Sequence, residues 1–319
     1  MTYAPYLLTV LVIVLPLLFA VIGTSLGQGF SAYWSLRATN IQPASQPEIA
    51  RINLLGSALL ESSLVLGLLP SIFLIFDQTK TTPEFYPSIA RLGILFSSGL
   101  VCMIAPAVSW RSIKKACLAA SRQPFFGTKI FQLLLLTMAL LQTPVFLSFM
   151  ITFFARHRAL TITTLGECLQ ILASGIAVGL GSIGPMIGLA HVIRSAIQGV
   201  GRNRSALEGL RTFTFLSEGL LGTPIAFSFI TALLILLRTT TNPSLLQGIL
   251  FMSAALTIGL GTMLPGIASG RVASTACKEI AHDPANLTPI RTASFLSQIF
   301  LESLTVYAFL VTLILLFFA

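Results

Sequence analysis

The sequence predicts an all-α membrane protein with eight transmembrane helices, arranged as four fused helical hairpins. The 319 residues are 55% hydrophobic and only 9% charged, whereas soluble domains carry about 25% charged residues. Long apolar runs recur along the whole chain, and two short sequence landmarks return at a constant interval. Together these observations predict a membrane fold built by repetition.

The apolar runs are each near or beyond the ~20 residues that a spanning helix needs. Backbone polar groups in lipid must be satisfied within a segment, and the runs lack the alternation of a barrel strand, so helices are predicted. The eight runs cover residues 5–36, 52–76, 90–113, 130–155, 168–200, 212–237, 245–270 and 292–319.

Basic residues gather near alternate connections between these runs, and they predict the topology. Fourteen of the nineteen Lys and Arg residues lie near the first, third, fifth and seventh connections, which the positive-inside rule assigns to the cytoplasm. Both termini are then expected on the other side. The net charge of +9 is spread between helices and forms no nucleic-acid patch. The fourteen residues are Arg37, Arg51, Arg111, Lys114, Lys115, Arg122, Lys129, Arg194, Arg202, Arg204, Arg211, Arg271, Lys278 and Arg291.

The repeat has a period of 81, 80 and 80 residues, set by IQP at 41–43, RQP at 122–124, RNR at 202–204 and HDP at 282–284. The same offsets relate LLESS around Glu61, LLQTP around Gln142, LLGTP around Gly222 and FLESL around Glu302. Unrelated membrane helices share composition but not register, so four copies of one hairpin are predicted. We place them at residues 1–77, 85–157, 165–238 and 245–319.

The stretch GLGSIG at 179–184 has the G-x-G-x-x-G spacing of a dinucleotide-binding turn. That motif needs a preceding strand and an acidic residue about twenty positions later, whereas this one lies inside a continuous apolar run. Gly175 and Gly188 extend the same pattern of small residues. The glycines therefore predict close helix packing within the membrane.

Two longer stretches carry a family resemblance. LASGIAVGLGSIGPMIG, followed by the RNR turn, and RTASFLSQIFLESLTVYAFLVTLILLFFA resemble the two helices of the proteolipid c subunit of F-type rotary ATP synthases. The resemblance covers nearly the whole chain as four hairpins. It implies a glycine-rich inner helix, a cytoplasmic loop and an outer helix with one mid-membrane carboxylate, with many hairpins forming a rotor ring.

The family carboxylate carries over to Glu61 and Glu302, whereas the equivalent positions hold Gln142 and Gly222 and are expected to be vestigial. An ionisable group inside an apolar span is costly, about 2.5–3.5 kcal/mol at the centre, and marks an ion pathway by default. Glu218 also lies deep in a span, one helical turn before Gly222. It is either a displaced third site or a residue bonded to Ser217, Ser182 or the polar layer near the loop.

The resemblance implies a mechanism and partners. Desolvation favours the neutral carboxyl, so Glu61 and Glu302 are expected to move through lipid protonated and to ionise opposite an arginine of a stator a subunit. Further partners are other copies of the chain, central-stalk subunits of the gamma and epsilon type, and membrane lipids. Arg122, Gln123 and Pro124 keep the family loop motif and are the expected stalk contacts.

The transported ion is expected to be H⁺, with Na⁺ as the alternative. Gln28, Ser62, Ser303 and Tyr307 are possible accessory positions around the carboxylates. Hard cations want several oxygen ligands, and only the first hairpin offers a glutamine such as Gln28, which favours protons. No cofactor is expected, and the scattered cysteines and histidines predict no metal site.

Two other functions compete with a rotor subunit, which itself performs no covalent chemistry. A secondary transporter would also show repeats, but we expect it to have broken helices around a closed site rather than uniform hairpins. A structural or degenerate ring or pore would account for the two missing carboxylates. The expected location of the rotor subunit is an energy-coupling membrane, by default the bacterial inner membrane.

Overall fold

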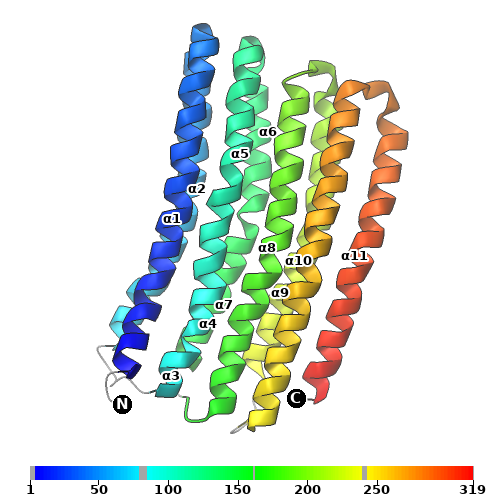
Figure 1. Ribbon diagram of the computed structural model, residues 1–319. Helices are drawn as coiled ribbons and strands as arrows, with labels where there is room; N and C mark the ends of the chain where they lie inside the picture. Colours follow the sequence, from blue (N-terminus) through cyan, green and yellow to red (C-terminus); the bar gives the residue numbers. More distant parts are fainter. Residues whose placement is uncertain (1–3, 79–84, 161, 239–242, 319) are drawn as a thin grey trace.

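A computed structural model describes residues 4–78, 85–160, 162–238 and 243–318, and these segments form long helices joined by tight turns (Figure 1). Each hairpin turn contains one turn of 3-10 helix. The helices are α1 (Ala4–Ile41), α2 (Gln46–Gln78), α3 (Phe85–Ala90), α4 (Leu92–Ile94), α5 (Leu100–Arg122), α6 (Gly127–Leu141), α7 (Thr143–Arg158), α8 (Leu165–Val200), α9 (Leu207–Leu237), α10 (Leu245–His282) and α11 (Leu287–Phe318), with the 3-10 turns Pro43–Ser45, Pro124–Phe126, Arg204–Ala206 and Pro284–Asn286 and a π-helical stretch, η2 (Leu95–Gly99).

Eight helical segments are long and apolar enough to cross a membrane, which confirms the predicted fold class. The described residues contain helices and no strand. The segments are Tyr6–Ile41, Pro43–Asp77, Tyr86–Arg122, Pro124–Arg158, Leu165–Val200, Arg204–Leu237, Leu245–His282 and Pro284–Phe318.

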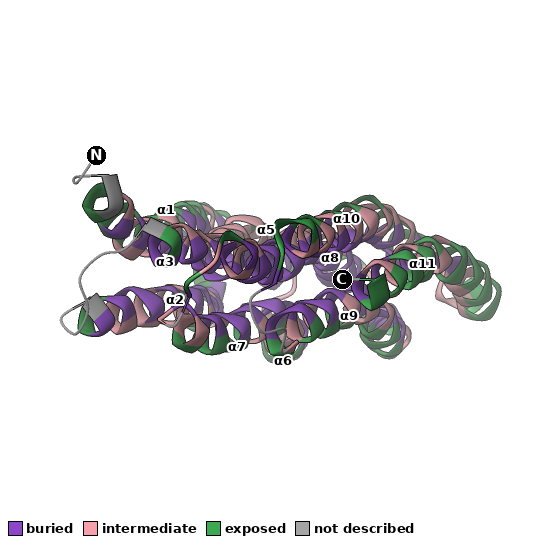
Figure 2. Cartoon of the chain, turned by 90° about the horizontal axis from the view of Figure 1, so that it is seen from below, coloured by how far each residue is buried: buried purple, intermediate pink, exposed green. Residues whose placement is uncertain are grey.

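The helices stand in two layers, seen from one end in Figure 2. One layer holds the first helix of each hairpin, namely α1, α3 to α5, α8 and α10, and we call it the inner layer. The outer layer holds α2, α6 with α7, α9 and α11. Hairpins 1 to 4 follow one another along both layers, so hairpins 1 and 4 form the two ends of the row (Figure 1).

Contacts between neighbouring hairpins join residues about one repeat apart. Thr9 contacts Ser88, Ser195 contacts Ser274 and Ser63 contacts Gln142, each pair 79 positions apart in sequence. Phe30 stacks on Trp110 with ring centroids 4.8 Å apart. Each hairpin therefore packs on the next by nearly the same displacement, which is the geometry of a head-to-tail array.

The turns are linked to one another in the same way. The Gln123 side-chain amide donates to the carbonyl of Gly201 at 3.0 Å, and the Asn203 amide donates to the carbonyl of Ala281 at 3.1 Å. Pro43, Pro124 and Pro284 begin their 3-10 turns, where the missing N–H of proline costs nothing. A side-chain amide in one turn thus fixes the next turn.

The glycines of GLGSIG lie in the middle of α8 and pack against other segments, as predicted. A Cβ at Gly179 would overlap the carbonyl oxygen of Phe96, and one at Gly184 would overlap that of Met263. A Cβ at Gly181 would overlap the side chain of Ser228 on α9. Glycine is needed here because the neighbouring backbones occupy the place of a side chain.

Hairpin 2 departs from the expected uniform hairpins. Its first helix contains a π-helical stretch at Leu95–Gly99, and its second helix is interrupted at Gln142 between α6 and α7. Pro144 has no N–H to donate to the carbonyl four residues earlier, which weakens the helix at this point. Pro224 occupies the same place in α9 and does not interrupt that helix.

Candidate functional site

Glu61 on α2 meets Gln28 on α1, within the same hairpin. The Gln28 amide Nε2 donates to Glu61 Oε1 at 2.7 Å, and the Glu61 side chain is exposed. The neighbouring Ser62 hydroxyl donates to the carbonyl of Leu59 instead. Of the two positions expected beside Glu61, the structure therefore brings Gln28 to the carboxylate, and Ser62 contacts its own helix.

Glu302 on α11 meets Thr223 on α9, a residue of the preceding hairpin. Thr223 Oγ1 lies 3.1 Å from Glu302 Oε2 and 3.0 Å from the carbonyl oxygen of Leu220. Thr223 Oγ1 is the donor, and its single proton is shared between the Glu302 carboxylate and the Leu220 carbonyl. The preceding hairpin thus supplies a hydrogen-bond donor to this carboxylate.

Neither of the accessory residues expected near Glu302 hydrogen-bonds to its carboxyl among the described residues. Ser303 donates its hydroxyl to the carbonyl of Phe300, and the Tyr307 side chain is 62% exposed. The second carboxyl oxygen, Oε1, is buried and has no hydrogen-bond partner among the described residues. Thr223 was missed as a partner in the sequence because its contact crosses between hairpins, although it sits one position after the landmark Gly222.

Gln142 occupies the carboxylate position of hairpin 2 and is 3% exposed. Its Oε1 accepts a hydrogen bond from Ser63 at 2.9 Å, and its Nε2 donates to the carbonyl of Leu59 at 3.0 Å. Both partners belong to α2 of the preceding hairpin. A neutral amide that donates and accepts at once ties hairpin 2 to hairpin 1.

Gly222 and Glu218 have different surroundings although they are one helical turn apart on α9. A Cβ at Gly222 would meet no atom within 4 Å, so the landmark position of hairpin 3 is open. Glu218 is 3% exposed, and neither carboxyl oxygen has a hydrogen-bond partner among the described residues. Of the two alternatives for Glu218, a bonded residue is wrong, since neither Ser217 nor Ser182 bonds to it among the described residues, and a displaced third site stays a prediction. Ser217 contacts Gln298, and Ser182 donates to Val178.

The structure places Arg122, Gln123 and Pro124 at the turn of hairpin 2. Arg122 is exposed, whereas the Gln123 amide is engaged with Gly201. Phe125, which sequence reasoning missed, is 99% exposed at the same turn. An apolar ring immediately after the proline of a polar loop was the signal that could have identified it.

Known proteins match part of this chain. The family model of the ATP synthase C subunit matches residues 252–315, which include Glu302. The ATP synthase c subunit of Gloeobacter violaceus is 46% identical over 66 residues, 21% of this chain and 80% of that protein. The chain belongs to the family of ATP synthase c subunits.

Further ATP synthase c subunits give the same match. The protein of Synechococcus sp. strain JA-2-3B'a(2-13) is 42% identical over 66 residues, which is 82% of its length, and that of Thermosynechococcus vestitus is 42% identical over 66 residues, 80% of its length. In each case 21% of this chain is covered, about one hairpin. Membership in this family implies a multi-pass component of an energy-coupling membrane and an ion-translocating rotor role.

Proposed function

We propose that this chain is a rotor subunit of a rotary ATP synthase or ATPase and that it carries protons on Glu61 and Glu302. The observation that supports the proposal is the contrast between landmark positions at corresponding places in the repeat. Glu302 can ionise and accepts a hydrogen bond from Thr223, whereas Gln142 cannot ionise and is hydrogen-bonded to α2. Gly222 carries no side chain. Two of the four landmark positions thus keep a group that can gain and lose a proton.

The proposed cycle needs one exchangeable proton for each carboxyl. A proton entering through one half-channel neutralises the carboxylate, and the neutral group then moves through lipid without the cost of a charge. Opposite a stator arginine the carboxyl ionises and releases its proton into the other half-channel. Each elementary charge that crosses the membrane yields about 2.3 kcal/mol per 100 mV, so several crossings combine per ATP.

Ring assembly would complete the Glu61 site. Within the chain, Thr223, one position after the landmark Gly222, supplies a hydroxyl to Glu302 of the next hairpin. Ser303 is the corresponding residue of hairpin 4, and hairpin 1 of a second copy would bring Glu61 to it. In a head-to-tail ring Glu302 of one copy and Glu61 of the next are neighbours, and two hairpins whose landmark positions lack a carboxylate follow. Such a rotor carries fewer ions per turn, which favours ATP-driven pumping or a large driving force.

Protons are the proposed cargo, because oxygen ligands are few at the Glu302 site. Thr223 supplies the side-chain oxygen that contacts this carboxyl, whereas Na⁺ needs several oxygen ligands. The Gln28 side chain carries a further oxygen, but it lies beside Glu61 and not beside Glu302.

The turn of hairpin 2, with Arg122, Gln123 and Pro124, is the proposed contact with the central stalk. By the positive-inside rule this turn faces the cytoplasm and both termini face away from it, in a bacterial inner membrane.

Labelling with dicyclohexylcarbodiimide tests the proposal, since this reagent modifies protonated carboxyls buried in membranes. We expect modification at Glu302 and Glu61 in the assembled complex, and loss of ATP-driven proton transport when both are replaced by Gln. Protection by Na⁺ would show a sodium site instead. Unchanged ATP-driven transport in the E61Q/E302Q complex would reject the rotor function.

A further inference from the structure

Hairpin 1 exposes a face of its inner helix that the other hairpins bury. Leu36 of α1 is 72% exposed, whereas Cys117, Ile197 and Cys277 hold the same place in the repeat and are each 0% exposed. Cys277 contacts Thr214 of hairpin 3, so this face packs on the preceding hairpin. Hairpin 1 stands at one end of the row in Figure 1, where a second copy of the chain can cover the same face. We call the contact between hairpin 4 of one copy and hairpin 1 of the next the seam.

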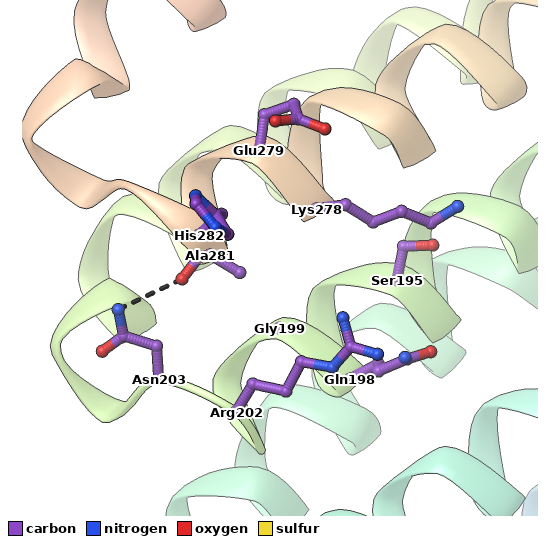
Figure 3. A pocket seen from close by; sticks show the side chains of 9 residues that line it. All are labelled: Ser195, Gln198, Gly199, Arg202, Asn203, Lys278, Glu279, Ala281 and His282. Carbon is purple, nitrogen blue, oxygen red and sulfur yellow. Dashed lines mark hydrogen bonds between the residues drawn. The ribbon is translucent and has the colours of Figure 1, made fainter.

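Near the turns, neighbouring inner helices meet through pairs of small residues. A Cβ at Gly201 would overlap Ala119 of hairpin 2, and a Cβ at Gly199 would lie 2.8 Å from the Cβ of Ala281 in hairpin 4. Beside the second pair a polar cavity of about 530 Å³ lies between hairpins 3 and 4, with Gly199 on one wall and Lys278 on the other (Figure 3). The repeat predicts which residues take these places at the seam.

At the seam, longer and charged residues take the places of the residues around this cavity. Glu279 stands 80 residues after Gly199, and Arg37 stands 241 residues, or three repeats, before Lys278. Glu279 is exposed and lies about 200° around α10 from Ala281, so it points away from hairpin 3. A second copy that is displaced like the next hairpin therefore brings its Arg37 opposite Glu279.

Glu279 and Arg37 have no ion-pair partner among the described residues. Arg37 is exposed, and its guanidinium carbon lies 5.1 Å from the ring centroid of Trp34, so the N–H groups can still bind a carboxylate. Asn40 takes the place of Ala281 in hairpin 1, is exposed, and offers a further amide donor. The two ends of the row thus carry opposite charges that lie apart within one copy.

We propose that Glu279 of one copy forms an ion pair with Arg37 of the next and that this pair selects the seam. The inference rests on the proposed head-to-tail ring and adds what determines the order of hairpins at a contact that is not covalent. Contact between two copies of hairpin 4 would bring carboxylates together, and contact between two copies of hairpin 1 would bring guanidinium groups together, so both wrong pairings are repelled. Inside the chain the position of Glu279 holds Ala38, Ala119 or Gly199, because linked hairpins need no such selection.

Charge reversal tests the seam. The full chain is purified in mild detergent, and native mass spectrometry measures the fraction in multimers. An attraction of about 0.5 kcal/mol that becomes a repulsion of similar size amounts to about 1 kcal/mol, so E279R and R37E should each weaken association about fivefold at every seam. R37E/E279R restores opposite charges and should assemble like the native chain. The control R204E reverses an exposed cation at the turn of hairpin 3 and should also assemble normally.

Two outcomes of this experiment would overturn the proposal. One is native-like assembly of E279R, and the other is failure of R37E/E279R to recover the multimers that the single variants lose. A native chain that stays monomeric would overturn the ion pair together with the ring. Proton carriage by Glu61 and Glu302 is read separately, from dicyclohexylcarbodiimide labelling, so failure of the seam and failure of the proton site can be distinguished.

A cross-link maps the contact directly, because a water-soluble carbodiimide joins a carboxylate to an amine that touches it. In assembled R37K we expect a cross-link between the introduced lysine and Glu279 of another copy, seen as multimers on denaturing gels and identified by mass spectrometry of the joined peptides. R37K/E279Q should lose this cross-link. Assembled R37K without it, or an equal yield in R37K/E279Q, would also overturn the proposal.

Discussion

Ser63 on α2 donates its hydroxyl to Gln142 on the second helix of hairpin 2, at 2.9 Å. The same amide group of Gln142 donates to the Leu59 carbonyl, so one side chain forms two bonds across the interface between hairpins. At this position the family resemblance places an ion-carrying carboxylate. In this chain the position holds Gln142, whose side chain bonds hairpin 2 to hairpin 1.

Replacing Gln142 by Leu should therefore destabilise the protein. The variant removes two buried hydrogen bonds and leaves the Ser63 hydroxyl without its acceptor, at a cost of about 1–3 kcal/mol. Thermal unfolding of the detergent-solubilised chain measures the change. Q132L, at an exposed position of α6, is the matched control and should stay within about 0.5 kcal/mol of the native protein. Equal stability of the two variants would contradict the role given to Gln142.

Replacing Gly222 by Glu should create a third carboxylate site. The position has open space around it, and Thr143, one residue after Gln142, is exposed in the preceding hairpin at the place that Thr223 takes before Glu302. We expect one carbodiimide-reactive carboxyl more per chain than in the native protein, and about 1.5 times as many protons per turn if Glu61, Glu302 and the introduced carboxyl each carry one proton. Mass spectrometry of the labelled chain counts the sites.

G219E is the control for this variant. Gly219 also has no atom within 4 Å of an added Cβ, and it is exposed on α9 three residues before Gly222. A carboxylate introduced at Gly219 has room for its side chain, but it does not stand at the landmark position of the repeat. If G219E and G222E react alike, the register does not define the site.

Replacing Thr223 by Val should speed carbodiimide labelling at Glu302 and leave labelling at Glu61 unchanged. The variant removes the hydroxyl that donates to the ionised carboxylate, an interaction of about 0.5–1.5 kcal/mol, so the protonated, reactive form gains and labelling becomes about twofold to twelvefold faster. T223S keeps the hydroxyl and should behave like the native protein. Identical labelling in T223V would remove Thr223 from the site.

The proposed seam between copies is open to cross-linking. With E61C and S303C in one chain, a short bismaleimide should join separate copies into a ladder of multimers on denaturing gels. The native cysteines Cys102, Cys117, Cys168 and Cys277 are buried, so background reaction is low. T223C/E302C provides the geometric reference and should cross-link within one chain. A chain carrying E61C/S303C that stays monomeric while the reference reacts would exclude this seam.

The α8 glycines should tolerate no side chain. Replacing Gly184 by Val forces a side chain into the backbone of α10 at Met263, and we expect overpacking of about 1–3 kcal/mol or more together with a lower yield of folded protein. Gly29 has no atom within 4 Å of an added Cβ, so G29A should fold normally. Membrane yield and thermal stability compare the two. A well-folded G184V would contradict the packing role.

The sequence alone predicted the eight helices, the fourfold repeat and the family, because apolar length and register depend only on residue order. It also predicted that Gly179 and Gly184 pack within the membrane rather than bind a phosphate. The proximity of Gln28 and Glu61 within one hairpin followed from the family pattern. Each of these conclusions concerns residues related by helical spacing or by the repeat.

Only the tertiary structure decided which residues meet across hairpins. It shows that Thr223 hydrogen-bonds to Glu302 and that Ser63 hydrogen-bonds to Gln142. It also shows that Glu218 is buried without a hydrogen-bond partner among the described residues and that the helix is interrupted at Gln142. These contacts depend on how far one hairpin is displaced and rotated against the next, a quantity set by backbone contact at the glycines. Residue order fixes what each helix carries, and close packing of the helices decides what each side chain contacts.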